Sequence, residues 1–116
     1  MASSNVQYFE GQLASVALVA PVTLSGAVTL TDAAGYNGNI LKLDPGGASR
    51  NVTLWPEEQK KGVVLFIING ADAAENLVIK DDAANTVVTI NQNEAALLQC
   101  NGTAWVLLCV VTIALS

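Results

Sequence analysis

Side chains alternate between apolar and polar in the stretch from position 22 to position 31. The apolar positions of this stretch are Val22, Leu24, Val28 and Leu30. The positions between them carry threonine, serine or alanine, apart from Gly26. A period of two residues places one set of side chains on each face of an extended chain, so the pattern predicts a half-buried β-strand. Ser25-Gly26 interrupts the alternation, and we expect a bulge or a tight turn there.

The rest of the chain continues in extended segments. No segment of ten or more residues places its apolar side chains at helical spacing. We expect further strands at 40–43, 50–55, 62–69, 77–80, 86–90, 95–100 and from 103 onward. A chain of about nine or ten short strands predicts an all-β fold, either a compact antiparallel β-sandwich or a small barrel.

Two turn signals stand out between these strands. Asp44-Pro45-Gly46-Gly47 combines residues that start turns with residues that accept positive φ. Asn101-Gly102 predicts a two-residue type I′ hairpin, because both central positions of that turn need positive φ. A Val-Thr-aliphatic triplet recurs at 22–24, 28–30, 52–54, 88–90 and 111–113. Its spacing is irregular, and we therefore expect no solenoid repeat.

The predicted hairpin also places the two cysteines. A two-residue loop pairs Cys100 with Thr103 and Glu94 with Cys109, which sets the thiols on the same face and about 20 Å apart along the strands. That separation is far beyond the reach of a disulfide. We expect two free thiols with a structural role, as suits a protein made in a reducing cytoplasm.

The first residues of the chain differ in character from the predicted strands. The polar segment Met1–Gln12 has no clear periodicity, so we divide the chain into an extended N-terminal arm (1–12) and a single β domain (13–116). The arm is either a frayed terminus or a segment laid on a neighbouring molecule, with Tyr8 and Phe9 as anchors. The segment 13–20 is apolar, but no Lys or Arg precedes it, which argues against a signal peptide. The apolar tail at 105–115 is too short for a transmembrane helix.

Charged side chains are scarce for so small a chain. They make up 13% of the 116 residues, about half of the roughly 25% usual in soluble domains. Because a small domain has much surface to cover, part of its outer surface should be buried against another molecule. The net charge is −5 and the five cations are scattered. We therefore expect neither a nucleic-acid partner nor an anionic membrane.

One strand is apolar on both faces. Val63 to Ile68 is an unbroken apolar run, whereas one face of a sandwich strand is normally wet. Either this strand lies centrally under further cover, or its outer face meets another subunit. We expect the runs Val63–Ile68 and Val106–Leu115 to supply both the core and the subunit contacts.

The residue types that catalysis needs are poorly represented. Histidine, the commonest general base and metal ligand, is absent. The carboxylate pairs Glu57-Glu58 and Asp81-Asp82 lie in predicted turns, where we expect them to be solvated rather than to converge on a substrate. The loop residues Asp72, Glu75, Asp81 and Asp82 have no EF-hand spacing and leave at most a weak calcium site. We expect no enzyme activity, no cofactor and no resident metal.

Trp55 and Trp105 allow two interpretations. Exposed tryptophans beside polar loops are typical of carbohydrate-binding platforms, but both residues lie in apolar strands. Packing in the core or at an interface is therefore the preferred interpretation.

The stretch from Leu41 to Trp105 resembles small β-rich modules of tailed-bacteriophage structural proteins, which include head decoration (cement) proteins and capsid or tail fibre domains. The pieces that carry the resemblance are Asp44-Pro45-Gly46-Gly47, Arg50-Asn51-Val52-Thr53-Leu54 with Pro56, Gly62 with the strand ending Ile68-Asn69, Leu77-Val78-Ile79-Lys80-Asp81, and Asn101-Gly102-Thr103-Ala104-Trp105. Trp55 departs from the pattern, in which the strand runs directly into the proline.

The resemblance implies a homotrimer docked on the major capsid protein, on the exterior of a virion. Decoration of the outer capsid surface is the leading interpretation, and a head or tail fibre module that binds a receptor or a carbohydrate is the alternative. The candidate capsid and subunit contacts are Tyr8, Phe9, Trp55, Val63, Leu65, Ile67, Trp105, Val111 and Ile113.

Overall fold

A computed structural model describes residues 20–113 of the chain. The predicted arm (1–12), with Tyr8 and Phe9, lies outside the described residues. The described elements, in chain order, are β1 (Val22–Thr23), β2 (Val28–Thr29), β3 (Ile40–Asp44), β4 (Arg50–Thr53), the 3-10 turn η1 (Glu57–Gln59), β5 (Val64–Asn69), β6 (Leu77–Lys80), β7 (Thr86–Ile90), β8 (Glu94–Cys100) and β9 (Trp105–Thr112). From β3 onward the predicted strands coincide with the observed ones except at their ends.

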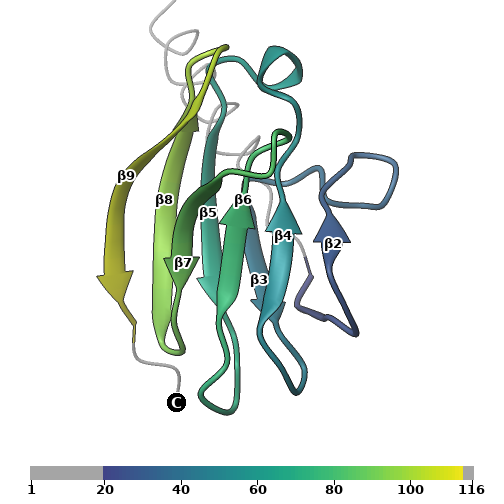
Figure 1. Ribbon diagram of the computed structural model, residues 1–116, viewed down its shortest axis with the longest axis vertical. Coiled ribbons are helices and arrows are strands. Elements are labelled where there is room, and N and C mark those ends of the chain that lie inside the picture. Colours follow the sequence, from purple (N-terminus) through teal and green to yellow (C-terminus); the bar gives the residue numbers. More distant parts are fainter. Residues whose placement is uncertain (1–19, 114–116) are drawn as a thin grey trace, which may run out of the picture.

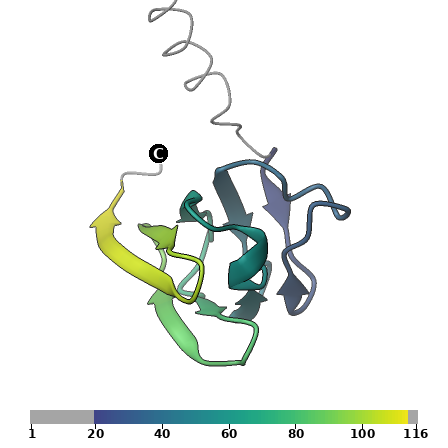
Figure 2. The same cartoon turned by 90° about the horizontal axis from the view of Figure 1, so that it is seen from above.

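The nine strands form two sheets that face each other (Figure 1). One sheet has the order β1-β3-β5-β8-β9 and the other has the order β2-β4-β6-β7. Seen from above, the strands lie in two layers on either side of a common core (Figure 2). The predicted all-β fold is therefore confirmed, and the structure is an open pair of sheets rather than a closed barrel. Within residues 20–113, no helix is long and apolar enough to cross a membrane.

The prediction of antiparallel pairing is wrong for half of the molecule. Strand β3 pairs in parallel with both β1 and β5, and β4 pairs in parallel with both β2 and β6. Successive strands alternate between the sheets, so the chain winds as a flattened coil from β1 to β6. A short hairpin turn cannot join parallel neighbours, and the connection has to cross to the other sheet and return.

The winding brings together two of the five recurring triplets, although their spacing along the chain is irregular. Val28 lies beside Val52, and Val52 lies beside Ile79, at equivalent positions of successive turns of the coil. The triplets 28–30 and 52–54 are therefore stacked neighbours, and Leu30 N–H donates to the Thr53 carbonyl at 2.8 Å. Ser25-Gly26, predicted as a bulge or a tight turn, is the corner at which the chain passes from one sheet to the other.

The coil ends at the turn between β6 and β7, where the chain reverses. The Asp81 carboxylate accepts hydrogen bonds from the backbone N–H groups of Ala83 and Asn85, and Ala84 adopts positive φ. After this turn all pairing is antiparallel: β7 pairs with β6, β8 with β5, and β9 with β8. The last three strands are thus added to the ends of the coil's two sheets.

Aliphatic side chains from both sheets fill the space between the layers. The largest fully buried side chains are Leu30, Leu41, Leu43, Val52, Leu54, Leu65, Ile67, Asn69, Leu77, Ile79, Ile90 and Leu98. Asn69 is the one polar residue of this set, and its amide N–H₂ donates to the carbonyls of Glu75 and Ile90 at 2.9 Å each. Its side-chain oxygen accepts from Ala71 N–H, so the buried amide has its partners and ties the two sheets together.

The hairpin between β8 and β9 is longer than predicted. Cys100 pairs with Trp105, and Cys109 pairs with Leu97, which corrects the predicted two-residue loop and its register. The reason is the Asn101 side chain, whose oxygen accepts hydrogen bonds from the backbone N–H groups of Thr103 and Ala104. This side-chain turn replaces the type I′ turn, with positive φ at Gly102. Both thiols are free, as predicted, with Cys100 buried and Cys109 exposed.

Candidate functional site

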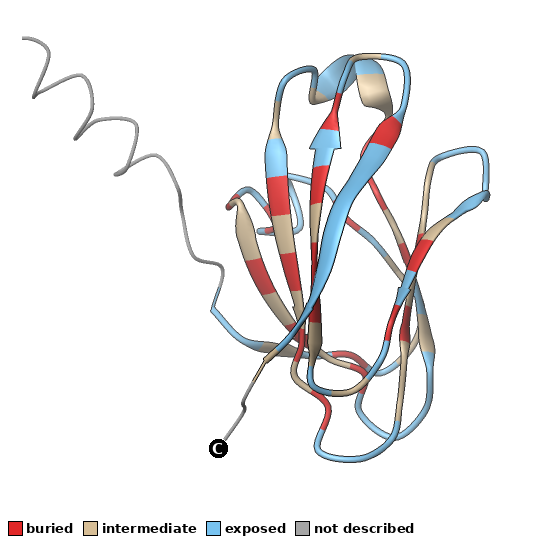
Figure 3. Cartoon of the chain, turned by 90° about the vertical axis from the view of Figure 1, so that its left-hand side faces the viewer, coloured by how far each residue is buried: buried red, intermediate tan, exposed pale blue. Residues whose placement is uncertain are grey.

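Strand β9 carries the most unusual surface among the described residues, because its apolar side chains are exposed. It runs for eight residues along one end of the five-stranded sheet, and only Trp105, its first residue, is buried. The exposed fractions of its apolar side chains range from 38% at Leu107 and Val111 to 49% at Leu108. Figure 3 shows this strand as an almost uninterrupted exposed band. No residue from Trp105 to Thr112 carries a charge.

Both faces of β9 are apolar, and each is only partly covered by the described residues. Leu107 pairs with the buried Leu98, so it shares the face that looks toward the other sheet. That sheet ends at β7, which contacts β9, and the inner-face residues Leu107 and Val110 keep exposed fractions of 38% and 39%. Cys109 and Val111 alternate with these residues on the outer face. A strand with two apolar faces is typical of the middle of a structure, yet β9 lies at its edge.

The outer face of the five-stranded sheet continues the apolar surface of β9. Cross-strand pairing sets three rows across β5, β8 and β9: Val64 with Gln99 and Val106, Phe66 with Leu97 and Cys109, and Ile68 with Ala95 and Val111. We call this surface the outer apolar face. Val64 is 41% exposed, while Phe66 and Ile68 are half-buried. The described residues therefore cover the outer side of β5 only in part. Within the same rows Gln99 is exposed and polar, and Ala95 is fully buried.

The predicted contact residues separate into two groups. Trp55, Leu65, Ile67 and Trp105 are at most 6% exposed and belong to the core of the chain itself. Val111 is exposed on β9, and Val63 and Ile113 are half-buried at the ends of β5 and β9. The structure thus brings Val111 and Ile113 to the apolar surface of β9, whereas Tyr8 and Phe9 lie outside the described residues.

The two tryptophans contact each other inside the fold. The Trp105 indole N–H donates to the Trp55 carbonyl at 2.9 Å. The Lys60 ammonium lies 4.7 Å from the centre of the Trp55 ring and forms an ion pair with Asp32 at 2.9 Å. This lysine covers the ring and adds a cation–π contact. Neither tryptophan offers an exposed ring face on which a sugar could stack.

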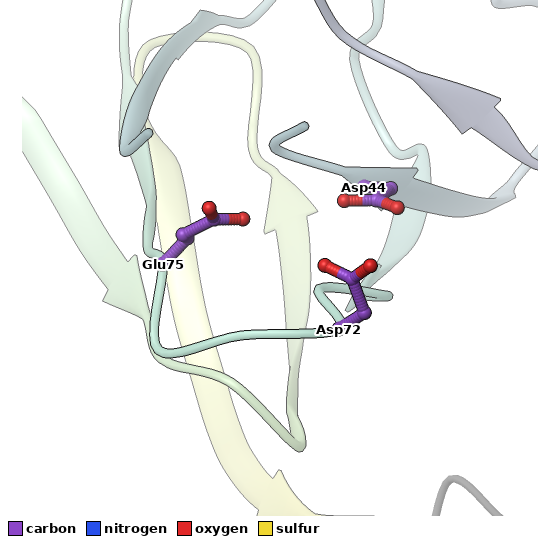
Figure 4. Close-up of side chains that lie close together, drawn as sticks. All are labelled: Asp44, Asp72 and Glu75. Carbon is purple, nitrogen blue, oxygen red and sulfur yellow. The ribbon is translucent and has the colours of Figure 1, made fainter. Parts of the chain in front are cut away.

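Three carboxylates gather at the end of the coil where β3 and β5 finish (Figure 4). One oxygen from each of Asp44, Asp72 and Glu75 lies within 4.8 Å of the others. Asp72 and Glu75 are two of the four loop acids considered for calcium, but their observed neighbour is Asp44 rather than Asp81 or Asp82. Asp44 also lines a cleft of about 220 Å³ with Pro21, Val22, Thr23, Lys42 and Gly70.

Sequence reasoning missed Asp44 because it assumed antiparallel pairing. In a parallel pair the carboxyl ends of both strands lie at the same edge of the sheet, so Asp44 at the end of β3 meets the loop that follows β5. The available signal was the acidic last residue of β3 together with the acidic residues in the loop after β5. Without knowledge of the pairing, that signal could not be interpreted.

A second acidic pair forms between η1 and the β6–β7 turn. A hydrogen bond from its own backbone lowers the pKa of Glu57, but desolvation and the nearby carboxyl of Asp82 outweigh it, so the pKa is raised above its ordinary value. Glu58 and Asp82 are exposed, and the proximity of the two predicted carboxylate pairs is a contact that the sequence did not predict. The buried Cys100 thiol donates to the Glu57 carbonyl at 3.2 Å.

Comparisons of the chain with protein-family models, with curated proteins and with solved structures give no match. The function has to be argued from the residues themselves. Of the surfaces described, the apolar strand β9 and the outer apolar face are the largest departure from an ordinary wetted protein surface.

Proposed function

We propose that the protein is a non-enzymatic structural subunit of a virion, a capsid decoration (cement) protein that binds the outer surface of the major capsid shell as a homotrimer. The observation that carries the proposal is the exposed, charge-free apolar surface on β9 and on the adjoining outer apolar face. The resemblance of Leu41–Trp105 to tailed-bacteriophage modules supplies the virion context.

The distribution of charge supports a binding role for this surface. The net charge is −5, yet β9 contains no charged residue, and the charged side chains of residues 20–113 lie in the loops, in η1 and on other strands. Interfaces are depleted in charge at their centre and polar at their rim. A decoration protein needs only binding energy, because many modest contacts are multiplied by the number of copies on a shell.

A fibre module that binds a carbohydrate is the alternative. It needs exposed tryptophan rings beside polar loops, and both tryptophans are buried. Decoration is preferred for that reason. Binding of the purified chain to a glycan array, abolished by substitution of a residue in the loops at 69–76 or 81–85, would reverse the preference.

Co-sedimentation with tailed-phage capsids stripped of their own decoration protein tests the proposal. We expect the full chain to pellet with the shells and to appear as regular protrusions in electron micrographs. Two charge-matched variants locate the contact. Val64→Lys places a cation on the outer apolar face, and Asn51→Lys places one at an exposed position of β4 on the opposite sheet.

Val64→Lys should weaken shell binding by about tenfold or more, as an unpaired charge in an apolar contact does, and Asn51→Lys should leave it unchanged. Absence of the wild-type chain from the pelleted shells, across capsids from several tailed phages, would contradict the proposal. Equal loss of shell binding in both variants would show that the outer apolar face is not the surface that contacts the shell.

A further inference from the structure

The four outermost strands of the two sheets differ greatly in how they are protected. An unprotected edge strand offers a row of free N–H and C=O groups to another chain, and proteins usually prevent such pairing. Strands β1 and β2 are only two residues long. Strand β7 exposes Thr86 and Thr89 and half-buries Val87, so its edge carries polar side chains. The short lengths of β1 and β2 and the polar side chains of β7 are features that protect edge strands from pairing with other chains.

Strand β9 lacks most of these protections. Its eight residues include no proline and no charged residue. A shift in register opposite Leu97 and Leu98 makes Leu108 an extra residue, and a bulge of this kind twists a strand locally. Beyond the bulge, Cys109–Thr112 pairs regularly with β8, and its other edge has no partner strand among residues 20–113.

The chemistry of this edge favours a second copy of the same chain as its partner. Two copies related by a two-fold axis place Cys109–Thr112 antiparallel to itself, so apolar side chains meet apolar side chains along the whole contact. Each chain carries a charge of −5, and contact between copies is least opposed where the strand has no charge. Pairing would also place β9 inside a wider sheet, the position that its two apolar faces suit.

We infer that β9 binds β9 of a second copy, through antiparallel pairing of Cys109–Thr112 across a two-fold axis. The two five-stranded sheets then join into one continuous sheet. This contact goes beyond the proposed decoration function, because it uses the free backbone edge of β9, whereas the shell contact uses the side chains of β9 and of the outer apolar face. It is compatible with a trimer only if a separate three-fold contact exists, in which case the assembly has six copies. The inference therefore predicts an even number of copies.

Light scattering on the full chain under reducing conditions tests the copy number. Val110→Lys places a charge at an exposed position of the paired stretch, and Thr89→Lys places the same charge on the β7 edge as a matched control. We expect an even-numbered wild-type assembly and an unchanged Thr89→Lys variant. In Val110→Lys the concentration for half-association should rise by about 100-fold, the effect of an unpaired charge in such a contact.

A monomer or a trimer as the wild-type species would overturn the inference. A trimer would leave the decoration proposal intact. A protein that pairs through β9 but does not bind the shell would contradict the decoration proposal and leave the pairing in place. A wild-type monomer in which Cys109 resists a thiol reagent would show that the chain covers its own edge, which also overturns the inference.

Disulfide scanning provides a test that does not rest on a destabilising charge. In a Cys109→Ser background, Val110→Cys, Val111→Cys and Thr112→Cys each introduce one thiol on β9, and the native chain supplies the fourth position. Under mild oxidation, cross-linking between copies should peak at one or two adjacent positions nearest the axis, because antiparallel partners approach within disulfide reach only there. Thr89→Cys in the same background should stay uncross-linked. Equal yields at β9 and at position 89 would contradict the pairing.

Discussion

The coil made by β1–β6 and the antiparallel strands β7–β9 contain the same types of apolar residue, but they bury them to different extents. In the coil, a β-branched or aliphatic residue on the inner face of one sheet is covered by the opposite sheet and flanked by the next turn, and Leu30, Val52 and Leu54 are fully buried. In β9, similar residues stay 38–49% exposed, because only the edge strand β7 of the opposite sheet reaches this strand. Burial therefore follows from a strand's neighbours and not from its composition.

The largest expected difference between the two regions is in the effect of truncating a leucine. Leu54→Ala leaves a cavity in the coil's core and should lower the free energy of unfolding by about 3 kcal/mol. Leu108→Ala removes a side chain that is 49% exposed, and it should change that free energy by about 0.5 kcal/mol or less. Urea denaturation below the concentration at which copies associate measures both. Similar losses in the two variants would mean that β9 is covered within one chain.

A smaller difference concerns how closely successive turns of the coil approach. Gly46 and Gly47 both have positive φ, but a β-carbon on Gly46 would collide with the Leu24 backbone oxygen of the preceding turn, and one on Gly47 would meet open space. Each substitution by alanine should cost about 1 kcal/mol in backbone strain. Gly46→Ala should cost more than Gly47→Ala by at least about 1 kcal/mol, since overpacking adds to the strain.

Thermal unfolding of the two glycine variants at one pH checks this expectation. If both lose the same stability, the turns of the coil can move apart at little cost. The coil would then be less tightly packed than the contrast with β9 requires.

The smallest expected effect lies at the turn that joins the two regions. Hydrogen bonds from the backbone of Asn85 hold the pKa of Asp81 below its ordinary value, with a further hydrogen bond from the Asn85 side chain. A lowered pKa in the folded state contributes stability above the unfolded-state pKa, and this contribution is lost as the pH falls through the folded-state pKa. Asp81→Asn should therefore lower the melting temperature at neutral pH, and the difference should vanish in acid, below the lowered pKa of Asp81.

Glu58→Gln is the control for the change in net charge, because Glu58 is an exposed carboxylate in η1. Its melting temperature should follow that of the wild type at every pH. A difference for Asp81→Asn that persisted in acid would assign the effect to the shape of the turn instead of the ionised carboxylate.

Much of the local structure could be predicted because it depends on neighbours in sequence. Alternation identified the strands, and the Asp44-Pro45-Gly46-Gly47 signal identified a turn with two positive φ angles. The hairpin at Asn101-Gly102 was located correctly but given the wrong length, since a side-chain turn competed with the type I′ turn. The parallel pairing was missed because unequal connections hide the equivalence of positions 28, 52 and 79.

The candidate surface was only partly predictable for the same reason. The apolar residues of β9 and the two-faced strand β5 are visible in the sequence, and they indicated an interface before any strand order was known. Which of them stay exposed depends on where each strand lies in its sheet. The carboxylates of Asp44, Asp72 and Glu75 meet only because β3 and β5 are parallel.

The order of residues by itself determined that this chain forms short strands and that it carries few charged side chains. Its thiols are free as predicted, although the register used for that prediction was wrong. Only the tertiary structure decided that the chain winds before it reverses and that its longest apolar strand is left at an edge. The physical reason is that strand formation responds to the alternation of adjacent side chains. Pairing and exposure, in contrast, depend on segments distant in sequence that compete for the same edges.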